Sequence, residues 1–391
     1  MLPTITFFPV DNGDMTLIKL NDTTTILIDI NIREIAEDEQ EPACNVIKEL
    51  RDRIEEDEEG RPYVDAFLLS HPDQDHCRGL REQFHLGSLD DYNFDPSEGE
   101  SLKIVIREMW SSPMIFRRAS KNNALCEDAR AFNTEARRRV KLFKKNGSAV
   151  EGDRIIIIGE DENGKTDVLQ SILVKVDEVF NKVNGKRNDH VSMRVLGPLP
   201  VQDDDEEEGQ LGKNRSSVIM QFTLESDGRK YACLFLTGGD AGVYFWEKLS
   251  EKQGSTPANI NYALLQAQHH CSWHSLSYDS WSDDEDPQAS QKAKSAFSQA
   301  RDGAFIVSSS KPIKNDESDP PCWGAKNEYL SILESVEGEF FCTEEHPNEE
   351  NPEPLTFKVA NEGPQPPSKK SVPIMGSVVG AVSTREPWKH G

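Results

Sequence analysis

The densest group of potential metal ligands in this chain lies in one ten-residue segment, 70–79, which reads Ser-His-Pro-Asp-Gln-Asp-His-Cys-Arg-Gly. Two imidazoles and two carboxylates fall within six positions: His71, Asp73, Asp75 and His76. Carboxylates packed together repel one another and are costly to bury without a cation. The apolar run 64–69 before them predicts a buried strand that ends in a turn and then a helix over 76–83. The segment therefore predicts a divalent-metal site; the alternative is a solvated acidic turn.

Segment 70–79 resembles the second signature motif of the metallo-β-lactamase fold, His-x-His-x-Asp-His, with Asp73 in place of the second His. The variant His-x-Asp-x-Asp-His, with a Gly three residues after the last His, is similar to the ComEC-type branch, the hydrolase domains related to bacterial DNA-uptake proteins. Further segments resemble this branch in the right order: 6–14 (Thr-Phe-Phe-Pro-Val-Asp-Asn-Gly-Asp), 25–29 (Thr-Ile-Leu-Ile-Asp), 234–241 (Leu-Phe-Leu-Thr-Gly-Gly-Asp-Ala) and 267–275 (Ala-Gln-His-His-Cys-Ser-Trp-His-Ser).

The resemblance runs from about residue 4 to about residue 345 and implies an α/β fold, an αββα sandwich of two mixed sheets with outer helices. Strand-like patterns grouped in two halves, each followed by helices, agree with that architecture. We expect one domain over 1–360, with a basic helical insertion at about 110–147. Prolines with little apolar periodicity predict a flexible C-terminal tail over 361–391, or an arm that docks on a partner.

The resemblance also implies which residues would hold metal. The implied ligands are His71, Asp73, Asp75, His76, Asp240, His269 and His270. Four of these are predicted to be catalytic: Asp75, Asp240, His269 and His270. Four other residues are expected to position the ligands: Asp29, Asn214, Ser216 and Ser272. The family's late His, which would fall around 323–326, is absent, so His269 or His270 would have to complete the second metal.

One or two divalent cations are the predicted cofactors. Asp73 in place of a His makes the site harder and more anionic, which moves its preference from Zn²⁺ towards Mn²⁺ or Mg²⁺, although affinity alone favours Zn²⁺. Seven scattered cysteines show no paired ligand spacing, so a disulfide framework or a Cys-based zinc site is not expected. Cys77 and Cys271 adjoin the motif loops, where either packing or metal contact could explain them.

A basic segment at 101–147 runs against the charge of the chain. The net charge is −25, which argues against wholesale attraction to nucleic acid or an anionic membrane. The segment itself carries 12 Lys and Arg against four acids. A phosphate-gripping surface is predicted from its densest part: Arg117, Arg118, Arg137, Arg138, Arg139 and Lys141. The alternative is that these cations pair with acidic loops of the chain or of a second subunit.

No run approaches 18 apolar residues and no signal peptide is evident, so a cytoplasmic protein is expected. The leading functional prediction is a metal-dependent phosphodiesterase, a nuclease acting on single-stranded or unwound DNA. A second hypothesis is hydrolysis of a small phosphorylated or nucleotide metabolite. A third is a metal-depleted regulatory subunit of an antiviral-defence or DNA-processing complex, with a protein partner bound through the acidic loops and the tail.

Overall fold

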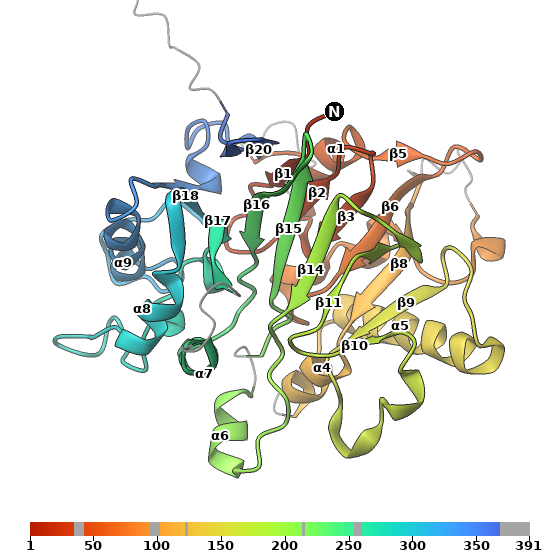
Figure 1. Ribbon diagram of the computed structural model, residues 1–391, viewed down its shortest axis with the longest axis horizontal. Helices are drawn as coiled ribbons and strands as arrows, with labels where there is room; N and C mark the ends of the chain where they lie inside the picture. The colour runs from red at the N-terminus through yellow and green to blue at the C-terminus, as the bar shows by residue number, and fades with distance from the viewer. Residues whose placement is uncertain (35–42, 94–101, 122–123, 213–215, 254–259, 368–391) are drawn as a thin grey trace, which may run out of the picture.

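The structure is a computed structural model that describes residues 1–34, 43–93, 102–121, 124–212, 216–253 and 260–367. Strands gather in the middle of the molecule, with α7, α8 and α9 at one side and α4 and α5 at the other (Figure 1). No helix among the described residues is long and apolar enough to cross a membrane.

The first sheet combines an antiparallel part with a parallel part. Its strand order is β10-β9-β8-β6-β3-β2-β1-β20-β21, with β5 and β7 attached at β6 and β8. The strands are β1 (Thr4–Phe7), β2 (Thr16–Lys19), β3 (Thr25–Ile28), β5 (Glu55–Glu56), β6 (Pro62–Leu68), β7 (Phe84–His85), β8 (Ile104–Ser111), β9 (Arg154–Ile158), β10 (Leu173–Val174), β20 (Leu355–Ala360) and β21 (Gly363–Gln365). β3, β6, β8 and β9 run parallel to one another, so their carboxyl ends meet at one edge.

The second sheet has the order β11-β14-β15-β16-β17-β18-β19. Its strands are β11 (Val179–Phe180), β14 (Val191–Val195), β15 (Met220–Ser226), β16 (Arg229–Leu236), β17 (Tyr262–Gln266), β18 (Ala300–Ser308) and β19 (Glu339–Cys342). The last four are parallel. A small hairpin, β12 (Lys182–Val183) with β13 (Lys186–Arg187), stands apart from both sheets.

Aromatic side chains join the two sheets into a shared core. The rings of Phe7 (β1) and Phe235 (β16) meet edge to face, with their centroids 5.7 Å apart. The ring centroids of Phe357 (β20) and Phe305 (β18) are 5.2 Å apart. Phe7, Phe235 and Phe357 belong to one cluster of buried apolar residues that draws on both sheets, and the partly buried Phe305 packs against it. Because such rings are buried only when one sheet covers the other, this cluster holds the two halves together.

Helices pack on the strands at both sides of this core. On the second sheet, α7 (Val243–Gln253), α8 (Gln291–Phe297) and α9 (Trp323–Glu334) share a separate apolar cluster, in which Trp246 and Phe297 lie 4.6 Å apart. On the first sheet, Phe132 of α5 (Glu127–Asn146) packs against Phe67 of β6. Two mixed sheets with flanking helices are compatible with the predicted sandwich; the αββα layer order stays a prediction.

One expectation about local structure differs from the structure. The helix predicted over 76–83 is two short helices, α2 (Gln74–Cys77) and α3 (Leu80–Gln83), because Arg78 is extended and Gly79 has a φ of +89°. The carbonyl of Arg78 accepts a hydrogen bond from the backbone N–H of Ile32, which pulls the chain out of helical geometry. In the acidic run 203–208, the residues from 205 onward belong to a short helix, α6 (Asp205–Gln210).

The basic insertion is helical as predicted, with α4 (Pro113–Ser120) followed by α5. The predicted tail begins later than residue 361, because Gly363–Gln365 pairs with β20 as β21. Residues 368–391, the rest of that tail, lie outside the described residues.

Candidate metal centre

The first half of the site is the turn that follows β6. The chain leaves β6 through Ser70 and His71 and enters α2 at Asp73. Asp73 occupies the N-cap position of α2 but its side chain caps no backbone N–H, so the carboxylate is free to face His71, whose Nε2 lies 3.5 Å away. Asp75 and His76 follow within α2 itself. Segment 70–79 therefore presents its polar groups where the sequence predicted, at the carboxyl end of a buried strand.

The second half of the site comes from the carboxyl ends of β16 and β17. Asp240 follows β16, and His269 and His270 lie in a short 3₁₀ turn after β17. The backbone N–H of His269 donates to the carbonyl of Gly239 at 2.8 Å, which ties this turn to the loop that carries Asp240. Gly238 makes the close approach possible, because a Cβ there would lie 2.6 Å from the carbonyl oxygen of Gln266.

The 3₁₀ turn has strained backbone geometry. Three successive residues have positive φ: His269 (+47°), His270 (+55°) and Cys271 (+67°). Left-handed geometry costs a non-glycine residue of order 1–3 kcal/mol, and it tends to occur where function requires it. None of the three is a glycine, the residue that adopts this geometry most easily.

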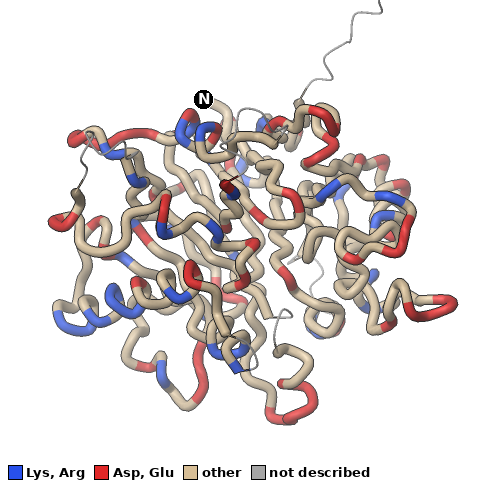
Figure 2. Tube along the Cα trace, turned by 180° about the vertical axis from the view of Figure 1, so that it is seen from behind, with Lys and Arg blue, Asp and Glu red and all other residues tan. Residues whose placement is uncertain are grey.

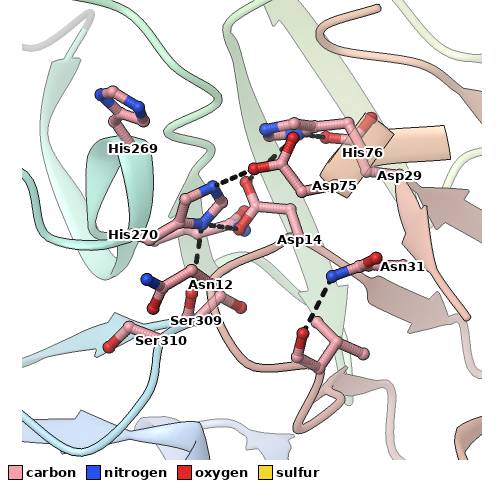
Figure 3. A network of polar contacts seen from close by, with 12 residues as sticks. Asn12, Asp14, Asp29, Asn31, Asp75, His76, His269, His270, Ser309 and Ser310 are labelled. Carbon is pink, nitrogen blue, oxygen red and sulfur yellow. Dashed lines mark hydrogen bonds and ion pairs between the residues drawn. The ribbon is translucent and has the colours of Figure 1, made fainter. Parts of the chain in front are cut away.

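The two halves meet, as the sequence-based hypothesis required. His76 Nε2 lies 2.9 Å from Asp240 Oδ1, and His270 Nε2 lies 3.2 Å from Asp75 Oδ2. His71 belongs to the same group, since its ring centroid is 5.5 Å from that of His76. Figure 3 shows Asp75, next to His76 in α2, directed at His270 in the turn after β17.

Each of the three central imidazoles is held through its Nδ1, which leaves Nε2 facing the cluster. Asp29 Oδ2 lies 2.9 Å from Nδ1 of His76, and the carbonyl of Ser216 lies 3.3 Å from Nδ1 of His71. The carbonyl of Ser309 lies 3.2 Å from Nδ1 of His270. A partner at one ring nitrogen fixes the tautomer and orientation of a metal-binding His, so this arrangement suits ligation through Nε2.

Unsatisfied buried atoms test whether the residues fit a cation. Among the described residues, His71 Nε2, His76 Nε2 and Asp240 Oδ1 are buried and form no hydrogen bond of good geometry, although His76 Nε2 and Asp240 Oδ1 lie within ion-pair distance of each other. Buried polar atoms without partners are rare and costly, and here they belong to neighbouring side chains. Ligand atoms of Asp75, His76 and His270 also lie within 4.8 Å of one another. Nitrogen and carboxylate-oxygen donors in this number fit a divalent cation.

The candidate ligands fall into two groups around Asp240. One group consists of His71 and Asp73. The other consists of Asp75, His76 and His270. Asp240 Oδ1 lies 2.9 Å from Nε2 of His76 and 3.9 Å from Nε2 of His270, and its charge also acts on His71. Asp240 therefore occupies the position of a carboxylate that could contact two cations.

The electrostatics of the site show how strongly these groups are coupled. Burial alone would lower the pKa of His76, but the carboxylates of Asp240 and Asp29 outweigh it and raise that pKa well above its usual value. Burial opposes the charge on Asp240, yet His76 holds the pKa of Asp240 well below its usual range. Burial also disfavours protonated His270, but Asp14 and Asp75 raise its pKa to about 10. Without a cation, protons on these rings balance the buried carboxylates.

Asp14 is a site residue that the sequence reasoning did not select. Its carboxylate is buried, lying 3.5 Å from Nδ1 of His270 and 3.8 Å from Nδ1 of His76 (Figure 3). Its backbone N–H donates to the carbonyl of Asp75 at 3.1 Å. The signal was present in the Gly-Asp pair of the 6–14 motif, but a single carboxylate there gave no reason to expect contact with residues more than 60 positions away.

The residues that were predicted to position the ligands differ in whether they contact a candidate ligand. Asp29 contacts His76 and Ser70, and Ser216 contacts His71, so both lie where they can position a ligand. Ser272 instead accepts a hydrogen bond from the backbone N–H of His274, which makes it a cap of the next turn. Asn214 lies outside the described residues.

His269 lies at the margin of the cluster. Its Nε2 is 3.8 Å from Asp240 Oδ2, its side chain is 21 % exposed, and burial lowers its pKa. Figure 3 shows its ring apart from the contacts that join the other labelled side chains of the centre.

Four of the six predicted phosphate-binding cations are engaged within the chain. Arg118 and Arg139 are 2 % and 1 % exposed, and each donates to a carboxylate and to backbone carbonyls. Arg117 pairs with acidic residues of the 161–162 turn, and Arg138 pairs with Glu135 and with an aspartate after α5. For Arg118 and Arg139 the phosphate-binding prediction is wrong, because their guanidinium groups are internal.

Arg137 and Lys141 remain on the surface of α5. Figure 2 shows Lys and Arg repeated along this helix. Together with Lys144 they line a cavity of about 730 Å³ whose floor includes Phe116 and Val140. The cavity also reaches Ser111 at the end of β8, the strand that runs parallel to β6. This basic concavity therefore borders β8, which is the neighbour of β6, and β6 leads into the ligand turn.

Comparisons with known proteins do not show which family this chain belongs to. No protein-family model matches the chain, and no curated protein matches it. Among solved structures, the chain is similar to a metallo hydrolase from the hyperthermophilic archaeon Ignicoccus hospitalis KIN4/I, with 10% identity over 91% of this chain and 99% of that chain, and a TM-score of 0.35. A likeness of this degree carries no argument about fold or activity. The similarity does not support the ComEC-type branch, which stays a prediction from the motifs.

Proposed function

We propose that this protein is a metal-dependent hydrolase, and that the reaction it catalyses is phosphodiester cleavage with DNA as the substrate. The observation that carries the proposal is the convergence of His71, His76 and Asp240, whose buried ligand atoms face one another without forming a hydrogen bond of good geometry among the described residues. A bound divalent cation would lower the pKa of a coordinated water and polarise the phosphoryl oxygen.

The chain's own residues would hold and orient the centre. His71 and Asp73 would bind on one side, Asp75, His76 and His270 on the other, with Asp240 between them. Asp73 and Asp75 have side chains 37% and 33% exposed, whereas the rings of His71, His76 and His270 are buried. The substrate would therefore approach from the side of these two carboxylates and of His269.

His269 has a role distinct from that of the buried rings in this proposal. Because burial lowers its pKa, the ring is neutral near pH 7. A neutral, partly exposed imidazole next to the centre can donate one hydrogen bond and accept another. It would orient the substrate phosphate.

The basic concavity on α5 supports an anionic substrate. Arg137, Lys141 and Lys144 line it, and they lie in a chain whose net charge is −25, so a local cationic surface is unusual here. A phosphate backbone is attracted to such a surface. The carboxylate-rich ligand set also suits Mn²⁺ or Mg²⁺, the cations that accompany phosphates.

A small nucleotide is the second candidate substrate. A cavity of about 730 Å³ has the size of small-molecule sites, and its apolar floor could accept a base while its cations contact phosphate. The third hypothesis, a metal-depleted regulatory subunit, has no particular observation in its favour.

The test is cleavage of labelled single-stranded DNA in the presence of Mn²⁺, Zn²⁺ or Mg²⁺. The variant is Asp75→Ala, and the matched control is Asp189→Ala, which removes an exposed carboxylate paired only with Arg187 among the described residues. We expect the wild-type and control proteins to cleave DNA and the Asp75 variant to lose about 100-fold or more.

The outcomes separate the three hypotheses. Cleavage of bis(p-nitrophenyl) phosphate without cleavage of DNA would favour the small-molecule substrate. Less than one bound ion per chain after gentle purification would favour the regulatory subunit. Wild-type protein that cleaves neither substrate faster than the Asp75 variant, with any of the three ions, would refute a phosphodiesterase.

A further inference from the structure

Two cysteine thiols lie against each other beside the metal ligands. The Sγ atoms of Cys77 and Cys126 are 3.5 Å apart, although the residues are separated by 49 positions in the sequence. Cys77 directly follows His76 in α2, and its thiol also lies 3.1 Å from the carbonyl oxygen of Asp73. Both cysteines are free thiols in this structure.

The position of Cys126 favours a reactive thiolate. It is the N-cap residue of α5, a helix of 20 residues, and its Sγ accepts a hydrogen bond from the backbone N–H of Ala129 at 3.3 Å. The positive end of a helix dipole stabilises a thiolate, which is the nucleophilic form of cysteine. Cys126 is also partly exposed, so a small oxidant can reach it.

The pKa of Cys126 differs from that of the other thiols. The hydrogen bond from the Cys77 thiol lowers the pKa of Cys126 to about 6. Burial instead raises the pKa of cysteines outside this pair, to about 12 for Cys44, Cys233 and Cys342 and to about 11 for Cys322. A selective oxidation site is therefore built from one thiolate and one neighbouring thiol.

We propose that Cys77 and Cys126 form a reversible disulfide when the protein meets a hydroperoxide, and that this bond alters the metal-ligand turn. The Cys126 thiolate attacks one oxygen of hydrogen peroxide, which gives a sulfenic acid and hydroxide. The Cys77 sulfur then attacks the sulfenic sulfur, and the displaced hydroxyl leaves as water with the thiol proton. Hydrogen peroxide is reduced and the two sulfurs are oxidised, in the manner of a redox-sensing thiol pair.

Bond formation would act directly on the ligand turn. A disulfide has an S–S length of about 2.05 Å, so the sulfurs must approach by roughly 1.5 Å from their present separation. Cys77 would also give up its thiol contact with the carbonyl of Asp73. Because His76 is the preceding residue in α2, the oxidised form should present its imidazole to a cation less favourably.

The test begins with full-length reduced protein treated with a small excess of hydrogen peroxide and mapped by non-reducing peptide mass spectrometry. We expect one cross-linked species that joins the Cys77 and Cys126 peptides, lighter by two hydrogen atoms and reversed by dithiothreitol. Cys126→Ser should abolish it, and since serine is a good N-cap residue, this variant should keep α5 folded. Cys322→Ser is the matched control and should leave the cross-link unchanged.

Several mapping results would overturn the proposal. The first is that the wild-type protein forms no Cys77–Cys126 cross-link. The second is that a cross-link between other cysteines forms in equal yield. The third is that Cys77 is oxidised in Cys126→Ser as fast as in the wild-type protein.

The effect on the turn is measured separately, as Zn²⁺ affinity of the oxidised and reduced wild-type protein. We expect about tenfold weaker binding after oxidation, restored by dithiothreitol and not seen in Cys126→Ser. Unchanged affinity with the disulfide formed would refute the effect on the turn. This readout rests on the candidate metal centre, whereas the peptide map does not, so failure of the metal site and failure of the disulfide are distinguishable.

Discussion

Asp29 offers the sharpest test of how the centre is organised. Its Oδ1 accepts a hydrogen bond from the backbone N–H of Ser70 at 2.7 Å. Its Oδ2 contacts the Ser70 hydroxyl and lies 2.9 Å from Nδ1 of His76. In Asp29→Asn, Oδ1 can keep its bond, but the new amide N–H₂ group would face the Nδ1–H of His76. The ring would then favour the tautomer with its proton on Nε2, the atom needed to bind metal.

The expected size of the effect follows from the position of Asp29 behind a ligand. Loss of such a partner typically reduces metal affinity 10–100-fold, which corresponds to about 1.4–2.7 kcal/mol. The assay is competition for Zn²⁺ against a chromogenic chelator. Asp65→Asn is the matched control, because Asp65 is also a buried carboxylate of the first sheet but accepts bonds from Thr25 and Arg107. Asp65→Asn should lower stability and leave metal affinity unchanged.

Two results would contradict this account. If Asp29→Asn binds Zn²⁺ as tightly as the wild-type protein, His76 does not bind metal through Nε2 with Asp29 as its orienting partner. If Asp29→Asn and Asp65→Asn lose affinity equally, the loss reflects general damage to the sheet and says nothing about the tautomer of His76.

Three further predictions follow from the same geometry. Carboxylate neighbours raise the pKa of His76 and His270, so both rings carry an extra proton near pH 7. Metal binding should therefore release about two protons and become tighter as the pH rises. Calorimetry in buffers of different protonation enthalpy measures the number of protons released. Gly13→Ala should weaken metal binding by about tenfold, measured by the same chelator assay, since the new methyl would lie 2.2 Å from Nδ2 of Asn31 and 2.9 Å from the carbonyl oxygen of Asp75. Arg139→Ala should lower the free energy of unfolding by about 3 kcal/mol in urea titration, because it removes a buried guanidinium from its carboxylate partner and two backbone carbonyls.

Each of these has a result that contradicts it. Metal binding without proton release would mean that the two imidazoles are already neutral, and thus that the carboxylates do not hold them protonated. Unchanged affinity in Gly13→Ala would mean that the turn can shift without moving Asp75. An unfolding free energy of Arg139→Ala within about 0.5 kcal/mol of wild type would mean that the ion pair contributes little beyond its own desolvation cost.

The sequence by itself determined the local features of this protein. A hydrophobic run before 70–79 is enough to predict a buried strand, and the ligand types in that segment are enough to predict a cation. The α4–α5 insertion was also predicted as helical, because helix formation depends on residues within a few turns of one another. These are short-range properties, so they can be read from the order of residues alone.

Only the tertiary structure decided which distant groups come together. His270 reaches Asp75 across 195 positions, and Asp14 joins the centre because the first turn of the chain packs against α2. The same holds for the charges, since Arg118 and Arg139 look like surface cations in sequence but are buried against carboxylates. Burial and partner choice depend on how strands far apart in the chain pair and how the sheets pack, and no local pattern records that.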